Sequence, residues 1–558
     1  MNRIDTHIDF HDMSWKKMLV SIFIASIIAG FASYISIMIS EAYYSIAPFH
    51  YDSVSYRLIG IRLYRVMQEK GLFNAILTSI PTRDDLDVTI RLLVAPKSLL
   101  NVYGHMFVLV PFMIGTFTLM IIYVYSKTES WSLSVIPLLF FFTFQQVYNP
   151  VQGIADYWKD NIAVWIIGCF VMTLIMSEYF RRRWWSFACG SMFGLLVLQR
   201  AGVAILMVVL LLPILATMLF PRIRKYGFKE IREGITYFLL PAIIFSGFFI
   251  VFDLEEFYVY NFKVGYDFWT LSKTYNNFIE VLSVNKSYWL TIPLIIMLTL
   301  YSVYTKNKKN YTNAVFVMSA AILFPIEIIC LKMYYHSTLS VVMVFILITL
   351  AMTVVSFSAN SRPHKLTVTA LIALAIMISV FQYETTEAAS RNKAVKDAPW
   401  RKLDENITDT LLQFPKPYNL IILYDEVWMA YLNHAFFNRG IPILTTDGIN
   451  FAEYFWVHDT YYQHRHGANR YEDVFEHYVD AMQKKDGTFA ISYCEPDDAN
   501  NADHFRWDSK KIAVPLTINL TRYLKSNQQW RVVNKFNSPE GNLCVYRYSS
   551  KIDVYKAR

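Results

Sequence analysis

Long apolar runs alternate with short polar connections over the first two thirds of the chain. A helix needs about 20 apolar residues to cross the hydrocarbon core of a bilayer. The run from Phe187 to Phe220 is too long for one span at about 1.5 Å per residue, so we divide it at the polar pair Gln199-Arg200. On these criteria the sequence predicts about eleven transmembrane helices, at 18–39, 104–126, 131–147, 161–178, 186–199, 202–220, 235–252, 288–304, 311–331, 338–357 and 366–381.

Basic residues gather in alternate connections, and this asymmetry predicts the orientation of the chain. Cytoplasmic segments carry an excess of Lys and Arg. The opposite connections are longer and mixed in charge. With the N-terminus in the cytoplasm, the odd number of spans puts everything after about Phe381 outside it. The basic residues then on the cytoplasmic side are Lys16, Lys17, Lys127, Arg181–Arg183, Arg222, Arg224, Lys225, Lys229, Arg232, Lys306, Lys308, Lys309, Arg362 and Lys365.

The N-terminal segment and the overall composition both support a membrane protein. The first span is expected to be a retained anchor, because Ser40-Glu41-Ala42-Tyr43 is a poor cleavage site for a signal peptide. The 558 residues are 55% hydrophobic and only 17% charged, whereas soluble domains carry about 25% charged residues. The net charge of +8 lies between apolar runs and forms no basic, aromatic-interleaved patch, so no nucleic-acid partner is expected.

Residues 382–558 are predicted to form an extracytoplasmic α/β domain. Apolar runs bounded by polar or turn residues indicate strands, and the alternation of strands and helices favours an α/β arrangement. We predict strands at 419–424, 441–444, 489–493, 530–536 and 542–548, and helices at 426–437 and 516–524. No glycine-rich nucleotide motif opens these helices. The His-rich segment 461–470 is either a solvated loop or a metal or glycan site.

The five cysteines fall into two groups. Cys169, Cys189 and Cys330 lie in or beside spans, where cysteine behaves as a small apolar residue. Cys494 and Cys544 lie in predicted strands of the outer domain, and an oxidising compartment would let them pair. Spacing alone does not show that they approach each other. No CxxC or HxxxH cluster indicates a structural metal site, and the sequence neither requires nor rules out a divalent metal.

The first outside loop, 41–103, follows the first span directly and contains a candidate catalytic residue. Tyr51-Asp52-Ser53 precedes an amphipathic helical pattern in which Arg57, Arg62 and Arg65 occupy polar positions. Such a helix would lie at the membrane interface, with its arginines toward anionic headgroups. A second short helix is predicted at 72–80.

This arrangement resembles the GT-C superfamily of integral-membrane glycosyltransferases. The shared features are an inside N-terminus, a long first outside loop with one or two amphipathic helices, and an acidic residue soon after the first span. The family often has a paired acidic motif there, whereas this sequence has the single carboxylate of Asp52-Ser53. The resemblance covers roughly residues 15–380 and implies a cytoplasmic tail at 1–16 and a GT-C-like transmembrane domain at 17–381.

The resemblance also implies roles for particular residues. Asp52 would be the general base on the acceptor, and Asp156 would be the second acidic residue, with Asp160 as the fallback. Family members place basic residues near the lipid phosphate. The residues that match by position, and that we assign to binding the lipid phosphate or the sugar, are Arg57, Arg200, Lys332 and His336.

Each of these residues also has a purely structural explanation. Asp52 and Asp160 could cap helices, and Asp156 could be a solvated loop residue. Arg200 could mark a turn, and Lys332 could extend to the interface. The remaining basic residues could face lipid headgroups or the interface, namely Arg57, Arg62, Arg65 and His336.

Physical chemistry fits the implied function. A sugar attached to a lipid phosphate retains its leaving group, so no nucleotide is needed outside the cell. A carboxylate would accept the proton of the acceptor hydroxyl, and Arg or Lys would stabilise the departing phosphate. The sequence is therefore interpreted as a glycosyltransferase, inverting at the anomeric carbon, that uses a polyprenyl-phosphate sugar and a glycan, lipid or protein acceptor.

Three other functions remain open at this stage. A transporter or lipid flippase would often show internal repeats or glycine-broken helices, and neither is evident among only 19 glycines. A surface-glycan polymerase or ligase differs only in its acceptor. A membrane scaffold would leave the recurring outside acids unexplained. The expected location is a bacterial inner membrane, with lipopolysaccharide or another surface glycan among the candidate acceptors.

Overall fold

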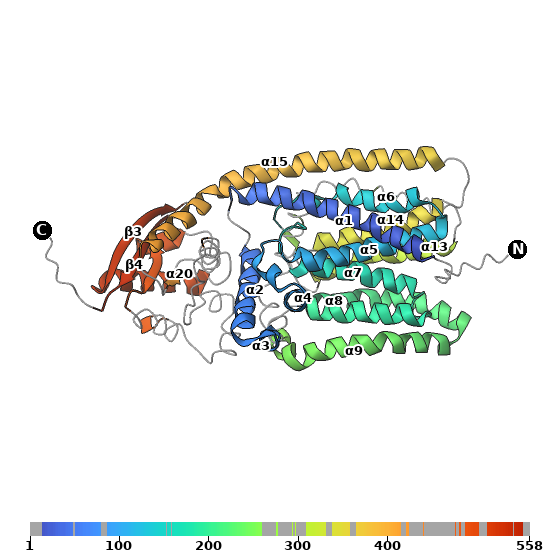
Figure 1. The fold of residues 1–558 in the computed structure, drawn as a ribbon, viewed down its shortest axis with the longest axis horizontal. Coiled ribbons are helices and arrows are strands. Elements are labelled where there is room, and N and C mark those ends of the chain that lie inside the picture. Colours follow the sequence, from blue (N-terminus) through green and yellow to red (C-terminus); the bar gives the residue numbers. More distant parts are fainter. Residues whose placement is uncertain are drawn as a thin grey trace. The chain divides into compact units, whose positions relative to one another are not determined.

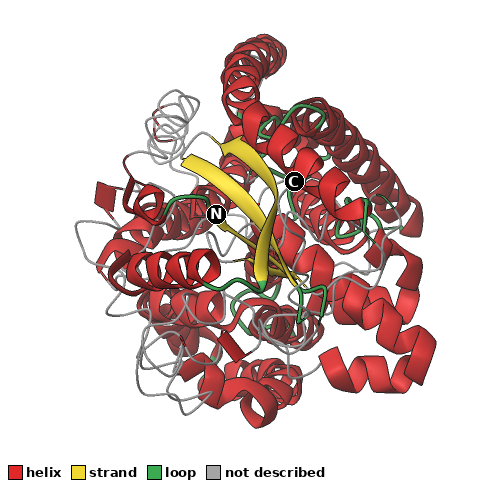
Figure 2. Ribbon diagram, turned by 90° about the vertical axis from the view of Figure 1, so that its left-hand side faces the viewer, coloured by secondary structure: helices red, strands yellow, loops and turns green. Residues whose placement is uncertain are grey.

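The described residues form many helices and one small sheet (Figures 1 and 2). The chain divides into two compact units, and helices α2 and α15 pass from one to the other. The first contains Met1–Ala42, Gly60–Phe257 and Trp269–Ser390, and the second contains Tyr43–Ile59, Tyr258–Phe268 and Arg391–Arg558. The structure is a computed structural model that describes residues 14–47, 51–79, 86–151, 153–157, 159–258, 275–276, 279, 293, 296, 308–330, 338–357, 364–414, 420–422, 439, 475, 479–480, 486–501, 510–538 and 541–550.

The helices of the first unit occupy the predicted apolar runs. Six described helices are long and apolar enough to cross a membrane, and two shorter apolar helices lie at 131–143 and 160–176. The predicted span at 288–304 lies outside the described residues, apart from two isolated positions. The bounds are α1 (Trp15–Tyr44), α5 (Met106–Thr128), α6 (Trp131–Leu139), α7 (Lys159–Met176), α8 (Arg183–Tyr226), α9 (Phe228–Tyr258), α13 (Lys308–Cys330), α14 (Thr338–Phe357) and α15 (His364–Leu412).

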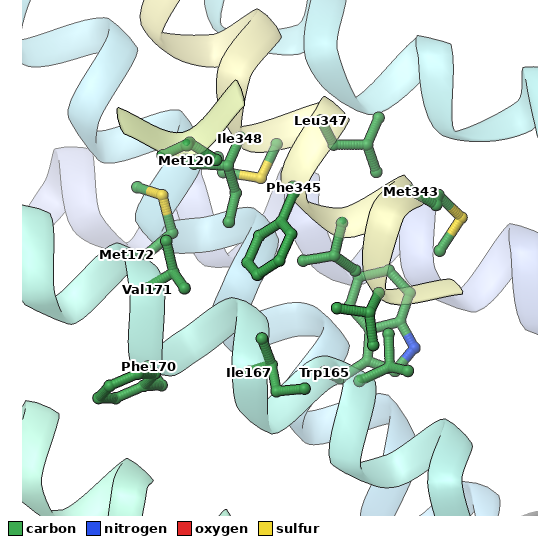
Figure 3. Close-up of a cluster of buried hydrophobic side chains, with 14 of the residues drawn as sticks. Met120, Trp165, Ile167, Phe170, Val171, Met172, Met343, Phe345, Leu347 and Ile348 are labelled. Atoms are coloured by element: carbon green, nitrogen blue, oxygen red, sulfur yellow. The ribbon is translucent and has the colours of Figure 1, made fainter. Parts of the chain in front are cut away.

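The core of this unit lies where α5, α7 and α14 meet. Helix α14 is the most apolar span, and its whole spanning window is buried. Only a third of the α1 window is buried, and many of its large apolar side chains point outward. Outward apolar surface on that scale fits a helix in contact with lipid. Figure 3 shows interdigitated core side chains, including Met120, Trp165, Ile167, Phe170, Met343 and Phe345.

The chain reverses direction within α8, as the sequence predicts. Arg200 has non-helical backbone angles of φ −159° and ψ 82°. The Arg222 guanidinium lies 4.2 Å from the centre of the Tyr179 ring, so the end of α8 returns to its beginning. The interval between them therefore holds two antiparallel helical halves, and the polar pair Gln199-Arg200 marks the turn between them.

The described part of the predicted first outside loop forms three helices and a short 3-10 turn. The predicted amphipathic helix is α2 (Tyr51–Lys70), and the predicted second helix is α3 (Leu72–Ser79). Helix α4 (Leu86–Val94) and the turn η2 (Pro96–Leu100) follow. Helix α15 runs well past its predicted end at 381, because the polar sequence after Phe381 contains good helix formers such as Ala, Glu and Lys.

The second unit contains a four-stranded sheet, which agrees with the predicted α/β class. The strands are β1 (Leu420–Ile422), β2 (Phe489–Tyr493), β3 (Trp530–Ser538) and β4 (Gly541–Tyr548), in the order β1-β2-β4-β3. β1 pairs parallel to β2, and the other pairs are antiparallel. Helix α20 (Lys510–Ser526) contains the predicted helix. Three predictions lie outside the described residues: the helix at 426–437, the strand at 441–444 and the His-rich segment 461–470.

The two cysteines of the C-terminal unit form a disulfide. Cys494 follows β2 directly and Cys544 lies in β4, and their Cα atoms are 4.9 Å apart. Cys169, Cys189 and Cys330 are free, and the first two are buried in the helical unit. The pairing that the sequence left open is therefore present, and it joins two neighbouring strands.

Candidate functional site

The segment 153–157, which leads into α7, is held by hydrogen bonds from helices α7 and α1. Asn161 donates from Nδ2 to the Gly153 carbonyl at 2.7 Å and to the Asp156 carbonyl at 3.3 Å. The Ala155 amide donates to Ser36 Oγ of α1 at 3.1 Å. Gly153 is required because a Cβ there would lie 1.9 Å from the Asn149 carbonyl oxygen. The segment is thus a fixed platform rather than a solvated loop.

Asp156 lies on this platform and is buried, with 1% of its surface exposed. Burial, the charge of Glu41 and the charge of Asp156, in that order, raise the pKa of the Tyr103 phenol. The Asp156 carboxylate is therefore close enough to act electrostatically on a group in the turn before α5. An ionisable group buried at the edge of a membrane domain is a functional candidate by default.

Arg200 forms an ion pair with Asp160. Arg200 Nε lies 2.7 Å from Asp160 Oδ1, and the arginine side chain is 32% exposed while the aspartate is 4% exposed. Asp160 is in the first turn of α7, where the helix dipole also favours a carboxylate. Because Asp160 is one turn beyond Asp156, the pair places a guanidinium in the same end of the helical unit as the predicted acid. The structure thus brings Arg200 into contact with Asp160, which the sequence offered as the fallback for Asp156.

A buried polar network beside this platform was not found by sequence reasoning. Asp87 and Arg91 lie one turn apart on α4, with Arg91 Nη1 3.5 Å from Asp87 Oδ2. Tyr157 Oη donates to the same Asp87 oxygen. Arg91 also donates to Ser98, from Nε to Oγ at 3.2 Å and from Nη2 to the carbonyl at 2.8 Å. The sequence signal that could have revealed this network is an acid and a base four positions apart in the largely apolar helix α4.

His105 completes the network at the start of α5. Its ring stacks on Tyr157 with centroids 4.8 Å apart and planes 8° apart, and Nε2 lies 3.4 Å from the Ile154 carbonyl oxygen. His105 therefore links the start of α5 to the segment 153–157 through both Ile154 and Tyr157.

The other predicted site residues belong elsewhere in the chain. Asp52 is in the first turn of α2, and its side chain lies outside the described residues. Arg57 is also on α2 and is 6% exposed, and burial lowers its pKa to about 10, so it stays charged at neutral pH. These two residues belong to the second unit, whereas Asp156 and Arg200 belong to the first. Lys332 and His336 lie outside the described residues.

Within the described residues, no group of three or more His, Cys, Asp or Glu side chains could hold a metal ion. The chemistry that the described site can supply comes from a buried carboxylate and a nearby guanidinium. A carboxylate accepts a proton, and a guanidinium pairs with a phosphate oxygen through directed hydrogen bonds. The described residues therefore offer a buried proton acceptor, Asp156, and a guanidinium that is paired with Asp160 one turn further along the chain.

Comparison with known proteins identifies the fold. Neither a scan against protein-family models nor a search of curated proteins finds a match for the sequence. Among solved structures, ArnT from Cupriavidus metallidurans bound to undecaprenyl phosphate has a TM-score of 0.58 at 10% identity, covering 93% of this chain and 98% of that one. The apo structure of the same protein has a TM-score of 0.56 with the same identity and coverage.

The similarity in fold extends over almost the whole chain. ArnT is a GT-C glycosyltransferase, so the resemblance seen in the sequence is confirmed at the level of the fold. The chain has a GT-C-like fold with several apolar spans and a small C-terminal sheet. Together with the apolar helices, this fold makes the protein an integral membrane protein.

Proposed function

We propose that the protein is a glycosyltransferase that moves a sugar from a polyprenyl-phosphate donor to an acceptor hydroxyl. The observation that carries this proposal is Asp156, a buried acid on a fixed platform, one turn before the Asp160–Arg200 ion pair. The GT-C-like fold supports it, since ArnT of similar fold was crystallised with undecaprenyl phosphate. The acceptor is a surface glycan, a lipid or a protein.

In the proposed reaction, the acceptor oxygen attacks the anomeric carbon of the donor. The bond between that carbon and the phosphate oxygen breaks, and the lipid phosphate leaves with the bonding electrons. A carboxylate takes the acceptor proton, with Asp52 as the base and Asp156 as the second acid. Arg200, with Arg57, Lys332 and His336, would bind the phosphate or the sugar, because a cation stabilises charge that grows in the transition state.

We further propose that transfer takes place outside the cytoplasm, at the outer face of a bacterial inner membrane. The basic residues Arg181, Arg182 and Arg183 and the site residue Asp156 lie at opposite ends of α7. Basic residues in short connections favour the cytoplasmic side, which leaves Asp156 on the outer side. The disulfide between Cys494 and Cys544 supports an oxidising compartment for the C-terminal domain.

The test is transfer of radiolabelled sugar from polyprenyl-phosphate donors in membranes with matched protein levels. We expect transfer by the wild type and a loss of about a hundredfold or more in Asp52→Asn and Asp156→Asn, the size expected for losing a general base. Asp409→Asn is the matched control, because its carboxylate is 57% exposed in the C-terminal unit. Movement of a solute or lipid across vesicles without any transfer would replace this proposal with a transporter.

A further inference from the structure

The network of Asp87, Arg91, Tyr157 and His105 is costly for the fold. Asp87 and His105 are fully buried and Arg91 is 1% exposed. Asp87 Oδ1 and Arg91 Nη1 make no hydrogen bond among the described residues. Buried ion pairs stabilise a fold only when their remaining polar atoms are satisfied. Stability alone therefore gives a weak reason for placing these charges here.

The network instead fixes the residues on either side of Asp156. Tyr157 follows Asp156 directly, and its hydroxyl bonds to Asp87 while its ring lies 5.3 Å from the Arg91 guanidinium carbon. On the other side, His105 contacts the Ile154 carbonyl oxygen. Asp87 and Arg91 come from the first outside loop, so this loop directly determines the conformation of the platform that bears Asp156.

We propose that Tyr157, oriented by Asp87, is a positioning residue that sets the direction of the Asp156 carboxylate for transfer. This inference rests on the proposed function. A catalytic group held in one geometry lowers the barrier to reaction, and a displacement of about 1 Å can reduce the rate about a hundredfold. Loss of the Tyr157–Asp87 hydrogen bond leaves the tyrosine ring in place but removes the restraint on its orientation.

The test compares Tyr157→Phe with Tyr179→Phe. Both variants remove one hydroxyl from a tyrosine that is buried in the first unit and hydrogen-bonded to a side chain, since Tyr179 Oη donates to Asn313 Oδ1 at 2.8 Å. We expect Tyr157→Phe to lower kcat about tenfold or more with KM for the donor nearly unchanged. Tyr179→Phe is expected to keep the wild-type kcat. Both variants should lower the thermal midpoint by similar amounts, because each loses one buried hydrogen bond.

A second readout does not depend on turnover. Carbodiimide modification of Asp156, followed by mass spectrometry, reports how well its carboxylate is held and shielded. We expect at least about tenfold faster modification in Tyr157→Phe than in the wild type or Tyr179→Phe, on the same reasoning. Asp87→Asn combined with Tyr157→Phe should lose little more than the more damaging single change, because the two residues act as one unit.

The outcomes separate the two proposals. An active wild type with equal kcat in Tyr157→Phe, or an equal fall in Tyr157→Phe and Tyr179→Phe, overturns the positioning role and leaves the proposed function standing. A wild type that transfers no sugar overturns the proposed function. In that case the positioning role is decided by the modification rates alone, and equal rates in both variants reject it.

Discussion

Replacing Gly104 with alanine tests the packing that joins the first outside loop to α5. An added Cβ would lie 1.8 Å from the Ser98 carbonyl oxygen and 2.7 Å from Arg91 Nη2. Those are the two atoms of the 2.8 Å hydrogen bond that holds Arg91. The methyl group therefore has to displace backbone by about 1 Å, and it separates a buried guanidinium from its acceptor.

The size of the effect follows from these two terms. Overpacking costs about 1–3 kcal/mol, and a hydrogen bond to a charged group contributes about 1.5–3 kcal/mol. One movement of the loop relieves both the overpacking and the strain on the hydrogen bond, so the two costs do not add in full. We therefore expect the free energy of unfolding to fall by about 2–5 kcal/mol. Sugar transfer should fall with it, because Arg91 contacts Asp87 and Tyr157.

The assay is thermal unfolding of the purified protein in detergent, with Gly30→Ala as the control. Nothing lies within 4 Å of a Cβ at Gly30, which is exposed on α1. Alanine at a helical position is favoured over glycine by about 1 kcal/mol, so the control should melt at or slightly above the wild-type temperature. We expect Gly104→Ala to melt about 2–4 °C lower. A midpoint within one degree of the wild type would refute the close approach of Gly104 to Ser98.

Two further predictions address other parts of the molecule. Asp160→Asn should weaken the hold on Arg200 and raise KM for the polyprenyl-phosphate donor severalfold, and an unchanged KM would count against a phosphate-binding role. Replacing Cys494 and Cys544 with serine opens a disulfide with a sequence separation of 50 and should destabilise the C-terminal unit by about 2–4 kcal/mol, measured by chemical unfolding under non-reducing conditions.

Local patterns were sufficient to predict most of the elements. The short apolar run at 489–493 was predicted to be a buried strand. It appears as β2 with those bounds, and all five of its residues are buried. The polar pair at Gln199-Arg200 predicted the turn within α8, because it interrupts a run of apolar residues that lipid would otherwise accept. In both cases the deciding information lies within a few neighbouring residues.

The candidate site was predictable only in part, because its contacts join distant segments. Asp156 and Arg200 were assigned through the resemblance to the GT-C superfamily, by their positions between apolar runs. The bond from Tyr157 to Asp87 spans 70 residues, and the contact from His105 to Ile154 spans 49. No periodicity in a single sequence reports such pairings.

Arg200 links the topology of the chain to its proposed chemistry. A continuous helix of 44 residues would be about 66 Å long, whereas the hydrocarbon core is about 30 Å thick. The chain must therefore turn within α8, and a turn leaves backbone polar groups that lipid cannot satisfy. A polar residue at the turn brings it to the membrane–water boundary, where a charged side chain is least costly. Pairing with Asp160 then fixes the guanidinium at the same end of the unit as Asp156, so the residue that ends one span is also the cation that the proposed reaction assigns to the leaving phosphate.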